Sequence, residues 1–252
     1  MAEPLLRLER VCKRFDGLLA VDNASFAVEA GRISALIGPN GAGKTTLFSI
    51  ISGFLTPSEG HIFHGGAEIT GIPPYLLARR GIVRTFQVAQ PFAGLTVHEN
   101  IAIGAHLWRR ARADALAAAA EVASAVGLGD LLGRPAASLT IAGRKRLELG
   151  RALAARPELL LLDEVLAGLN PSEVAAMVPI IRALAERGIT ILMIEHVMQA
   201  VMRLAEHVFV LAQGRIIAEG TPQAVVDDAA VIEAYLGHGA AARLSAAGAA
   251  HV

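Results

Sequence analysis

The sequence predicts an α/β fold in which helices cover both faces of a parallel sheet. Short apolar runs that suit buried strands alternate with longer segments of helical spacing, a pattern typical of parallel sheets. Hydrophobic residues make up 54% of the chain and aromatic residues only 4%, which suits alanine-rich helices packed on aliphatic strands. Half-exposed strands near the start and an inserted helical segment extend this core into an antiparallel β lobe and a helical lobe.

The antiparallel β lobe is predicted from residues 5–31, where polar and apolar residues alternate loosely. The pattern breaks at Asp16–Gly17 and at Ala30–Gly31, which leaves room for two or three half-exposed strands. Residues 32–38 form a short apolar run that ends in glycine, which is the pattern of a buried strand. Residues 43–54 then have the spacing of a helix.

The helical lobe is predicted where the composition shifts, from about Pro91 to Ala137. Residues 109–128 are rich in alanine, and their first half has almost no β-branched residues, which favours helix. One domain is therefore expected over residues 1–237. Its core occupies about 1–88 and 144–237, its helical lobe about 89–143, and a frayed Ala/Gly-rich tail covers 238–252.

Strands and helices alternate through the second half of the core. Pro171 and Gly188 suit the start and the end of a helix, and Pro179 is expected to kink it. The predicted elements are helix 144–155, strand 158–164, helix 171–188, strand 189–196, helix 197–205, strand 207–214 and a closing hairpin arm at 215–222.

Charge, cysteine content and hydropathy exclude several classes of protein. The 23 basic and 23 acidic residues balance, so there is no general electrostatic reason to bind nucleic acid. Cys12 is the single cysteine, which excludes an internal disulfide and fits a reducing compartment. The charged first 30 residues do not suit a signal peptide, and no apolar run approaches the roughly 20 residues that span a bilayer. A membrane role would therefore require a partner.

A phosphate-binding loop of the form GxxxxGK[ST] lies between a predicted strand and a predicted helix. Its glycines allow backbone N–H groups to face phosphate oxygens, and the helix that follows adds the positive end of its dipole. Lys44 can reach the β- and γ-phosphates, and Thr45 can ligate Mg²⁺. An isolated match could be a glycine-rich turn, but this context favours the phosphate loop. The nucleotide-binding residues are Gly38, Pro39, Asn40, Gly41, Ala42, Gly43, Lys44, Thr45 and Thr46.

Two acids follow the apolar run Leu159–Leu162. Asp163 at the strand end would hold Mg²⁺, directly or through water. Glu164 could polarise a water for attack on the γ-phosphate. A pair of acids can also simply cap a strand, and it is the phosphate loop that favours the chemical interpretation.

Three further residues are ambiguous by themselves. His196 ends a later strand and could be a satisfied terminal histidine, whereas Gln87 lies where the core meets the helical lobe and could be a polar loop residue. Phe15 could stack on a purine or belong to the core. The basic run 144–146 is interpreted as a solvated helix face.

Taken in order, these elements resemble the nucleotide-binding subunits of ABC transporters. The likeness covers about 5–237 and includes a signature-like stretch at 139–143 and the residues Ala-Gly-Leu-Asn-Pro at 167–171. Arg-Thr-Phe-Gln at 84–87, Leu-Thr-Val-His-Glu-Asn at 95–100 and the segment 217–237 resemble the subunits of high-affinity branched-chain amino-acid importers. Urea and amide importers are close relatives.

The resemblance implies a P-loop ATPase fold and a role for each matched residue. Phe15 matches the aromatic residue that stacks on adenine. Gln87 matches the residue that senses Mg²⁺ or the attacking water and couples to the transmembrane partner. Glu164 matches the general base, and His196 matches the histidine that contacts the γ-phosphate. Asn170 lies in a loop that crosses a dimer interface.

The implied function is ATP hydrolysis, with Mg²⁺, that drives transport from the cytoplasmic face of the inner membrane. Two cassettes would face each other head to tail, so that the signature stretch of one completes the ATP site of the other. Transmembrane permease subunits would follow the closing of this dimer, and a periplasmic binding protein would take part indirectly. The second cassette could be a copy of this chain, although the resemblance favours a paralogue. Nucleic acid is not expected as a partner.

The signature stretch departs from the family's Leu-Ser-x-Gly-Gln, because residues 139–143 read Leu-Thr-Ile-Ala-Gly. Thr140 keeps a hydroxyl, Ala142 adds a methyl group where the γ-phosphate should approach, and Gly143 lacks the amide side chain. We expect two unequal sites, the weaker one on the partner. Alternatively, backbone N–H groups and the helix dipole suffice.

Two other classes fit less well. Soluble ABC ATPases that act on nucleic acid or ribosomes usually carry two cassettes or a long coiled-coil insertion, and neither is present in the sequence. P-loop kinases and GTPases would leave Gln87, Glu164 and His196 without a common role, and the guanine-reading Asn-Lys-x-Asp motif is absent.

Overall fold

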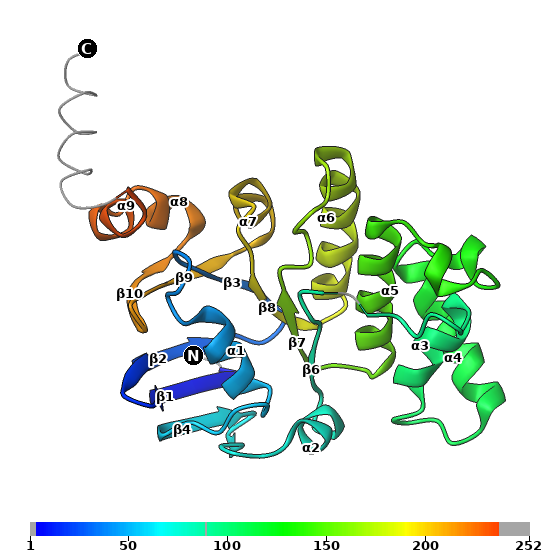
Figure 1. Cartoon of the computed structure of the whole chain (residues 1–252), viewed down its shortest axis with the longest axis horizontal. Helices are drawn as coiled ribbons and strands as arrows, with labels where there is room; N and C mark the ends of the chain where they lie inside the picture. The colour runs from blue at the N-terminus through cyan, green and yellow to red at the C-terminus, as the bar shows by residue number, and fades with distance from the viewer. Residues whose placement is uncertain (1–3, 89, 237–252) are drawn as a thin grey trace, which may run out of the picture.

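Two β-sheets organise the chain in a computed structural model that describes residues 4–88 and 90–236 (Figure 1). The larger sheet has the order β10-β9-β3-β8-β7-β6, and all its neighbouring strands are parallel except β9 and β10. Its strands are β3 (Ile33–Ile37), β6 (Ile82–Arg84), β7 (Leu159–Asp163), β8 (Thr190–Ile194), β9 (His207–Ala212) and β10 (Arg215–Gly220). The predicted parallel sheet and its closing hairpin are therefore confirmed.

The smaller sheet is antiparallel and has the order β2-β1-β4-β5. The sequence predicted β1 and β2 but not the short elements that follow helix α1 (Lys44–Ile51), where the apolar pattern is weak. The strands are β1 (Leu6–Phe15), β2 (Leu18–Val28), β4 (Glu59–His64) and β5 (Ala67–Glu68). Helix α2 (Pro74–Arg79) and strand β6, which also follow α1, were likewise not predicted.

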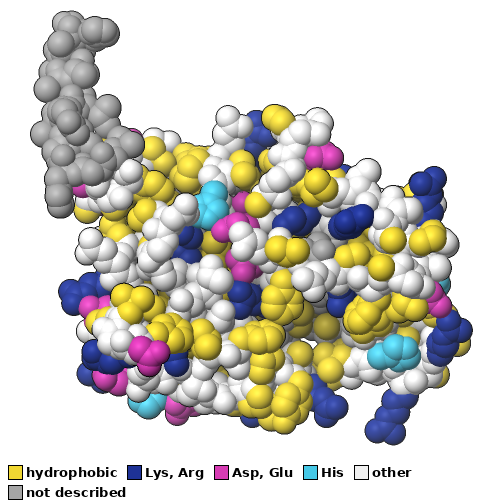
Figure 2. All heavy atoms as spheres, in the orientation of Figure 1, with side chains coloured by type: hydrophobic (Ala, Val, Ile, Leu, Met, Phe, Trp, Pro, Cys, Tyr) yellow, Lys and Arg dark blue, Asp and Glu magenta, His cyan; other side chains and the backbone are white. Residues whose placement is uncertain are grey.

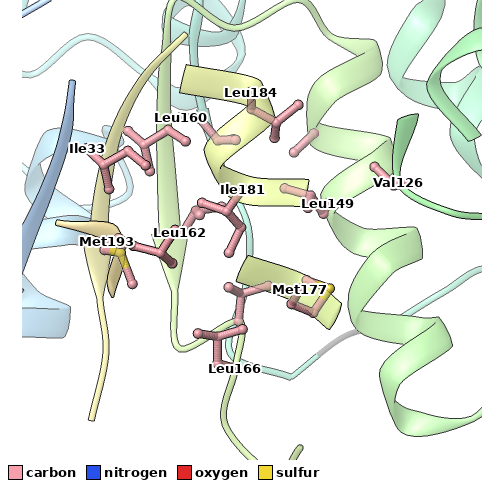
Figure 3. Packing of buried hydrophobic residues seen from close by; sticks show 14 of the residues in the cluster. Ile33, Val126, Leu149, Leu160, Leu162, Leu166, Met177, Ile181, Leu184 and Met193 are labelled. Atoms are coloured by element: carbon pink, nitrogen blue, oxygen red, sulfur yellow. The ribbon is translucent and has the colours of Figure 1, made fainter. Parts of the chain in front are cut away.

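The parallel strands carry two cores because their successive side chains point to opposite faces of the sheet. Leu160 and Leu162 of β7 belong to a cluster with helices α6 (Pro171–Glu186) and α7 (Met198–Leu204). Figure 3 shows this packing, in which Leu162 lies close to Ile181 of α6. Leu159 and Leu161 belong to a second cluster with α1 (Lys44–Ile51) and the antiparallel sheet. Both faces are thus covered, as predicted.

Three helices, α3 (Val97–Ala105), α4 (Arg112–Ala125) and α5 (Ile141–Ala154), lie together at one end of the molecule, and this group is called the helical lobe below (Figure 1). Buried alanines on α4 at every fourth position permit close packing of these helices. Helix α5 begins three residues earlier than predicted because Thr140 caps it, and its side chain accepts a hydrogen bond from Gly143 N. The expected boundary at 143/144 falls inside α5, and the division into lobes stays a prediction.

Local signals set the remaining helix ends. Asn170 caps α6 and forms a capping box with Glu173, with Pro171 at the first helical position. The short 3₁₀ turns at Gly129–Leu131 and Ala136–Ser138 connect α4 to α5, and α8 (Pro222–Val226) and α9 (Ala229–Leu236) follow β10. The expected kink at Pro179 stays a prediction, and the expected tail at 238–252 lies outside the described residues.

The face of the molecule shown in Figure 2 carries charges of both signs. Acidic and basic side chains are interspersed over the face shown in Figure 2. Within 4–88 and 90–236, none of the helices combines the length and the apolar character that a bilayer crossing requires.

Gly104→Ala should destabilise the helical lobe, although alanine is the better helix former by about 1 kcal/mol. A Cβ at Gly104 would lie 2.2 Å from the carbonyl oxygen of Arg151, so α3 and α5 would have to separate. We expect urea unfolding to show a loss of about 1–3 kcal/mol in the free energy of unfolding.

Gly94→Ala is the matched control, because a Cβ there meets nothing within 4 Å. Equal stabilities of the Gly104→Ala variant and the parent protein would contradict the close approach of α3 to α5.

Candidate nucleotide site

A cleft of about 560 Å³ opens beside the carboxyl ends of β3, β7 and β8, where open α/β sheets bind their ligands. The phosphate loop between β3 and α1 forms much of its wall. The sequence-predicted residues that line it are Phe15, Asn40, Gly41, Ala42, Gly43, Lys44, Thr45, Thr46, Glu164 and His196. The structure therefore brings together predicted residues from four separate parts of the chain.

The loop can follow its path only if glycine occupies two of its positions. A Cβ on Gly38 would lie 1.9 Å from the carbonyl oxygen of Leu211, and one on Gly43 would lie 2.3 Å from that of Ala20. Gly43 also has a φ of 103°, in the left-handed region that L residues rarely adopt. The loop is thus clamped between β2 and β9, which sets the start of α1 at the cleft.

Lys44 is the first residue of α1, and its side chain turns back into the loop. Its Nζ donates hydrogen bonds to the carbonyl oxygens of Gly38 (2.7 Å) and Pro39 (2.9 Å). Burial lowers the pKa of Lys44, and the negative charge of Glu164 opposes part of that decrease. The ammonium group is thus held within the loop that would contact phosphate.

Glu164 connects the two other predicted catalytic residues. Its Oε2 accepts a hydrogen bond from Nε2 of Gln87 at 2.6 Å, and its Oε1 lies 2.7 Å from Nε2 of His196. The Glu164 backbone has a φ of 49°, and its N–H donates to the carbonyl oxygen of Ile194. One carboxylate thus joins the ends of β7 and β8 to the loop that follows β6, which gives Gln87, Glu164 and His196 a common location.

Asp163 is buried at the end of β7 and faces a second groove of about 610 Å³. Thr45 and Gln87, the other residues predicted to bind metal, line the same groove. The Asp163 Oδ2 accepts a hydrogen bond from Nη2 of Arg84 at 2.7 Å. A hydroxyl, an amide and a carboxylate on one groove are oxygen donors that suit Mg²⁺. The residues therefore fit the expected metal.

Phe15 lies at the edge of the cleft with a ring that is 40% exposed. Its partner across the ring is Lys13, whose Nζ is 5.1 Å from the centroid. The position is open enough for a flat ring to stack on it, and Phe15 is not a residue of the core.

Thr140, Ala142 and Gly143 lie away from the cleft that holds Lys44. They form the cap and first turn of α5, which is separate from α1 in Figure 1. Thr140 and Ile141 are exposed at this helix start and can meet another molecule, whereas Ala142 and Gly143 are buried.

Lys145 corrects the prediction that residues 144–146 form a solvated helix face. Arg144 is exposed, but Lys145 is buried because α5 directs it toward the site. Its Nζ donates hydrogen bonds to the backbone carbonyls of Gln87 (2.7 Å) and Glu164 (3.0 Å). Burial lowers the pKa of Lys145, and the nearby acids, led by Glu195, raise it in part. Lys145 stands in a run of three basic residues, and this pattern in the sequence gave no sign that the middle residue is buried.

Glu195 is a second residue that the sequence did not reveal, although it directly precedes His196. Its carboxyl is buried, and its Oε1 accepts a hydrogen bond from the N–H of Leu166 at 2.9 Å. Burial raises the pKa of Glu195 to about 7, and the charge of Glu164 adds to the increase. The sequence did contain one sign of this burial, because Glu195 directly follows the apolar residues of the strand at 190–194.

Two family models match the chain. One described as "ABC transporter" matches residues 21–167, and one described as "Branched-chain amino acid ATP-binding cassette transporter" matches residues 215–241. The second match covers β10 and the helices that follow it.

Similar proteins agree with these matches. The high-affinity branched-chain amino acid transport ATP-binding proteins BraF of Pseudomonas aeruginosa and LivG of Escherichia coli are each 39% identical over 94% of this chain and 99% of their own length. A nucleotide-free ATP-binding cassette from an ABC transporter superposes with a TM-score of 0.85 at 33% identity, over 93% of this chain and 100% of the other. The ADP conformation of an ATP-binding cassette gives a TM-score of 0.86 at 33% identity, over 94% and 100%.

Glu195→Gln should remove a pH dependence of stability. Folding raises the pKa of Glu195 to about 7 from an ordinary 4.5, so the folded protein keeps a proton that the unfolded chain releases. The resulting stability is complete below the unfolded pKa and is lost as the pH rises through the folded one. As the pH rises from about 4.5 to about 7, the free energy of unfolding of the parent should fall by about 3 kcal/mol more than that of the variant. Urea unfolding at a series of pH values measures this difference.

Glu186→Gln, on the exposed side of α6, is the control for the removal of a negative charge. Stability curves for Glu195→Gln and the parent that run parallel with pH would show that Glu195 does not hold this proton.

Proposed function

The chain belongs to the ABC transporter family, and we propose that it is the subunit that binds and hydrolyses ATP to drive import of branched-chain amino acids. The proposal depends on one observation above all: Glu164 is held by both Gln87 and His196 at the mouth of the cleft that contains Lys44. The names of the relatives supply the solute class.

ATP would bind with its phosphates in the loop and its adenine on Phe15. Lys44 would exchange its two carbonyl acceptors for phosphate oxygens, because a hydrogen bond to a charged acceptor is the stronger one. The first N–H groups of α1 have no acceptors within the helix and add donors at the same place.

Hydrolysis would use Glu164 as the general base. A water attacks the γ-phosphorus, its proton passes to a Glu164 carboxylate oxygen, and the bond from the γ-phosphorus to the bridging oxygen breaks to give ADP and phosphate. His196 and Gln87 orient this carboxylate through its two oxygens. Mg²⁺ would be held by Thr45 and Asp163 next to Gln87, and it would neutralise charge on the phosphates.

The proposed partners are a second cassette, which would complete the ATP site, and a permease subunit. The first turn of α5 would complete the ATP site of a second cassette, either a paralogue or a copy of this chain. Gln87 lies in a groove with Phe86, Val88 and Phe92, each about half or more exposed, which suits contact with a permease subunit. The chain would thus act at the cytoplasmic face of the membrane, with a periplasmic binding protein on the other side.

Glu164→Gln should separate ATP binding from hydrolysis in the complex reconstituted in vesicles with its permease subunits. The amide can still meet Gln87 and His196 but cannot accept the proton, so turnover should fall by roughly 10²- to 10⁴-fold. Nucleotide affinity should stay within a few-fold, and uptake of labelled leucine should stop.

The surface variant Glu186→Gln should hydrolyse ATP and transport leucine like the parent. Rapid turnover by Glu164→Gln would remove Glu164 as the base, and a parent complex that consumes no ATP would end the proposal itself.

Ala142→Gly should strengthen the second ATP site of the assembled dimer. Only 9% of Ala142 is exposed in the single chain. Removal of its methyl group would let the first turn of α5 settle closer to the γ-phosphate of the second site, and one added hydrogen bond to a charged group, roughly 1.5 kcal/mol, corresponds to about tenfold in the ATPase rate of that site. Steady-state ATPase measurements on the assembled complex test this.

Ala137→Gly, an exposed position just before α5, controls for backbone flexibility. An unchanged rate for Ala142→Gly would favour the alternative in which backbone N–H groups and the helix dipole already suffice.

A further inference from the structure

Arg84 is a buried cation that the ATP chemistry described above does not use. It ends β6, and only 7% of its side chain is exposed. Its Nη2 lies 2.7 Å from Oδ2 of Asp163, whose side chain is 4% exposed. The pair therefore places a full positive charge against the acid that would hold Mg²⁺.

The same guanidinium group also contacts the helix that begins at the phosphate loop. Its Nη1 donates hydrogen bonds to the hydroxyls of Ser49 (3.0 Å) and Ser52 (3.2 Å) on α1. The Ser49 hydroxyl in turn donates to the backbone carbonyl of Thr45 at 2.7 Å. Arg84 thus links Asp163 to the helical turn that carries Thr45, another predicted metal ligand.

The pairing of Arg84 with Asp163 is incomplete. Arginine and carboxylate groups often form two parallel hydrogen bonds. Here Arg84 contacts Oδ2 alone, and its buried Nε has no hydrogen-bond partner among the described residues. The guanidinium group neutralises Asp163 but makes no hydrogen bond to its Oδ1. Asp163 and Thr45 line the same groove.

We propose that Arg84 is the internal counter-ion of Asp163 and that it keeps Mg²⁺ alone from binding there until a triphosphate arrives. The inference rests on the proposed ATP site. A buried carboxylate without a cation is strongly unfavourable, so Arg84 stabilises the metal-free protein. A divalent ion that enters beside the guanidinium meets a like charge, and the negative phosphates offset that repulsion.

The test uses the full chain, Mg²⁺ alone as the probe, and thermal unfolding in EDTA and across a Mg²⁺ series without nucleotide. Arg84→Met should have a lower Tm than the parent in EDTA. Added Mg²⁺ should restore much of this difference, because a ligand that binds the folded state raises Tm. The Mg²⁺ concentration that gives half of this recovery should be at least about tenfold below the concentration at which the Tm of the parent begins to rise.

Three further variants make the result specific. Arg84→Lys keeps the charge, so its Mg²⁺ response should resemble that of the parent, and the uncharged but polar Arg84→Gln replaces Arg84→Met if that variant does not fold. The double variant Arg84→Met with Asp163→Asn lacks the carboxylate and should not respond to Mg²⁺. Arg215→Met removes the arginine of another Arg–Asp pair, 2.6 Å from Asp22, and should lose stability equally with and without Mg²⁺.

The proposal is overturned if Arg84→Met loses the same Tm in EDTA and in saturating Mg²⁺, because Arg84 would then only support the fold. It is also overturned if the parent protein binds Mg²⁺ alone as tightly as the variant. These measurements need no nucleotide, so they stand apart from the proposed function, which fails separately if the parent does not bind ATP.

Discussion

The arrangement of the molecule depends on the hydrogen bonds and the ion pair that hold buried cations at the carboxyl edge of the parallel sheet. Lys44, Arg84 and Lys145 lie there with Asp163 and Glu195, all largely removed from water. A charge buried without a partner would cost several kcal/mol, so each cation must be held by acceptors from another element. These contacts therefore fix the positions of α1, α5, β6, β7 and β8 relative to one another, and they hold Lys44 and Glu164 on the wall of the cleft.

The pairing also ties the helical lobe to the proposed chemistry. Lys145 on α5 holds the backbone carbonyls of Gln87 and Glu164, while the side chains of those two residues hold each other. A shift of α5 would therefore break hydrogen bonds to Glu164, the proposed base, and not only contacts at a distant surface. Gly104 and Gly150 let α3 and α5 approach closely and make the lobe that carries Lys145 a packed unit.

Sequence patterns were sufficient for features that local chemistry determines. The loop at 38–46 has a recognisable spacing between a strand and a helix, and β7 and β8 are apolar runs that end in polar residues, so the edge of the sheet could be located. The meeting of Gln87 and His196 on Glu164 could be expected only from the resemblance. The burial of Lys145 and the Arg84–Asp163 pair could not be predicted, because both depend on which distant elements pack together.

The first turn of α5 explains why one chain holds only half of each proposed ATP site. The hydroxyl of Thr140 accepts the N–H of Gly143, so these two groups already satisfy each other as a helix cap. The N–H groups of Ile141 and Ala142 precede any intrahelical acceptor, and Ile141 is 63% exposed. Since this turn lies on α5 and away from Lys44, its free donors can satisfy a phosphate only on a second molecule. A helix start that is well capped, exposed at Thr140 and Ile141 and remote from its own loop is thus suited to recognise nucleotide across the proposed dimer interface, and closure of that dimer would then depend on ATP.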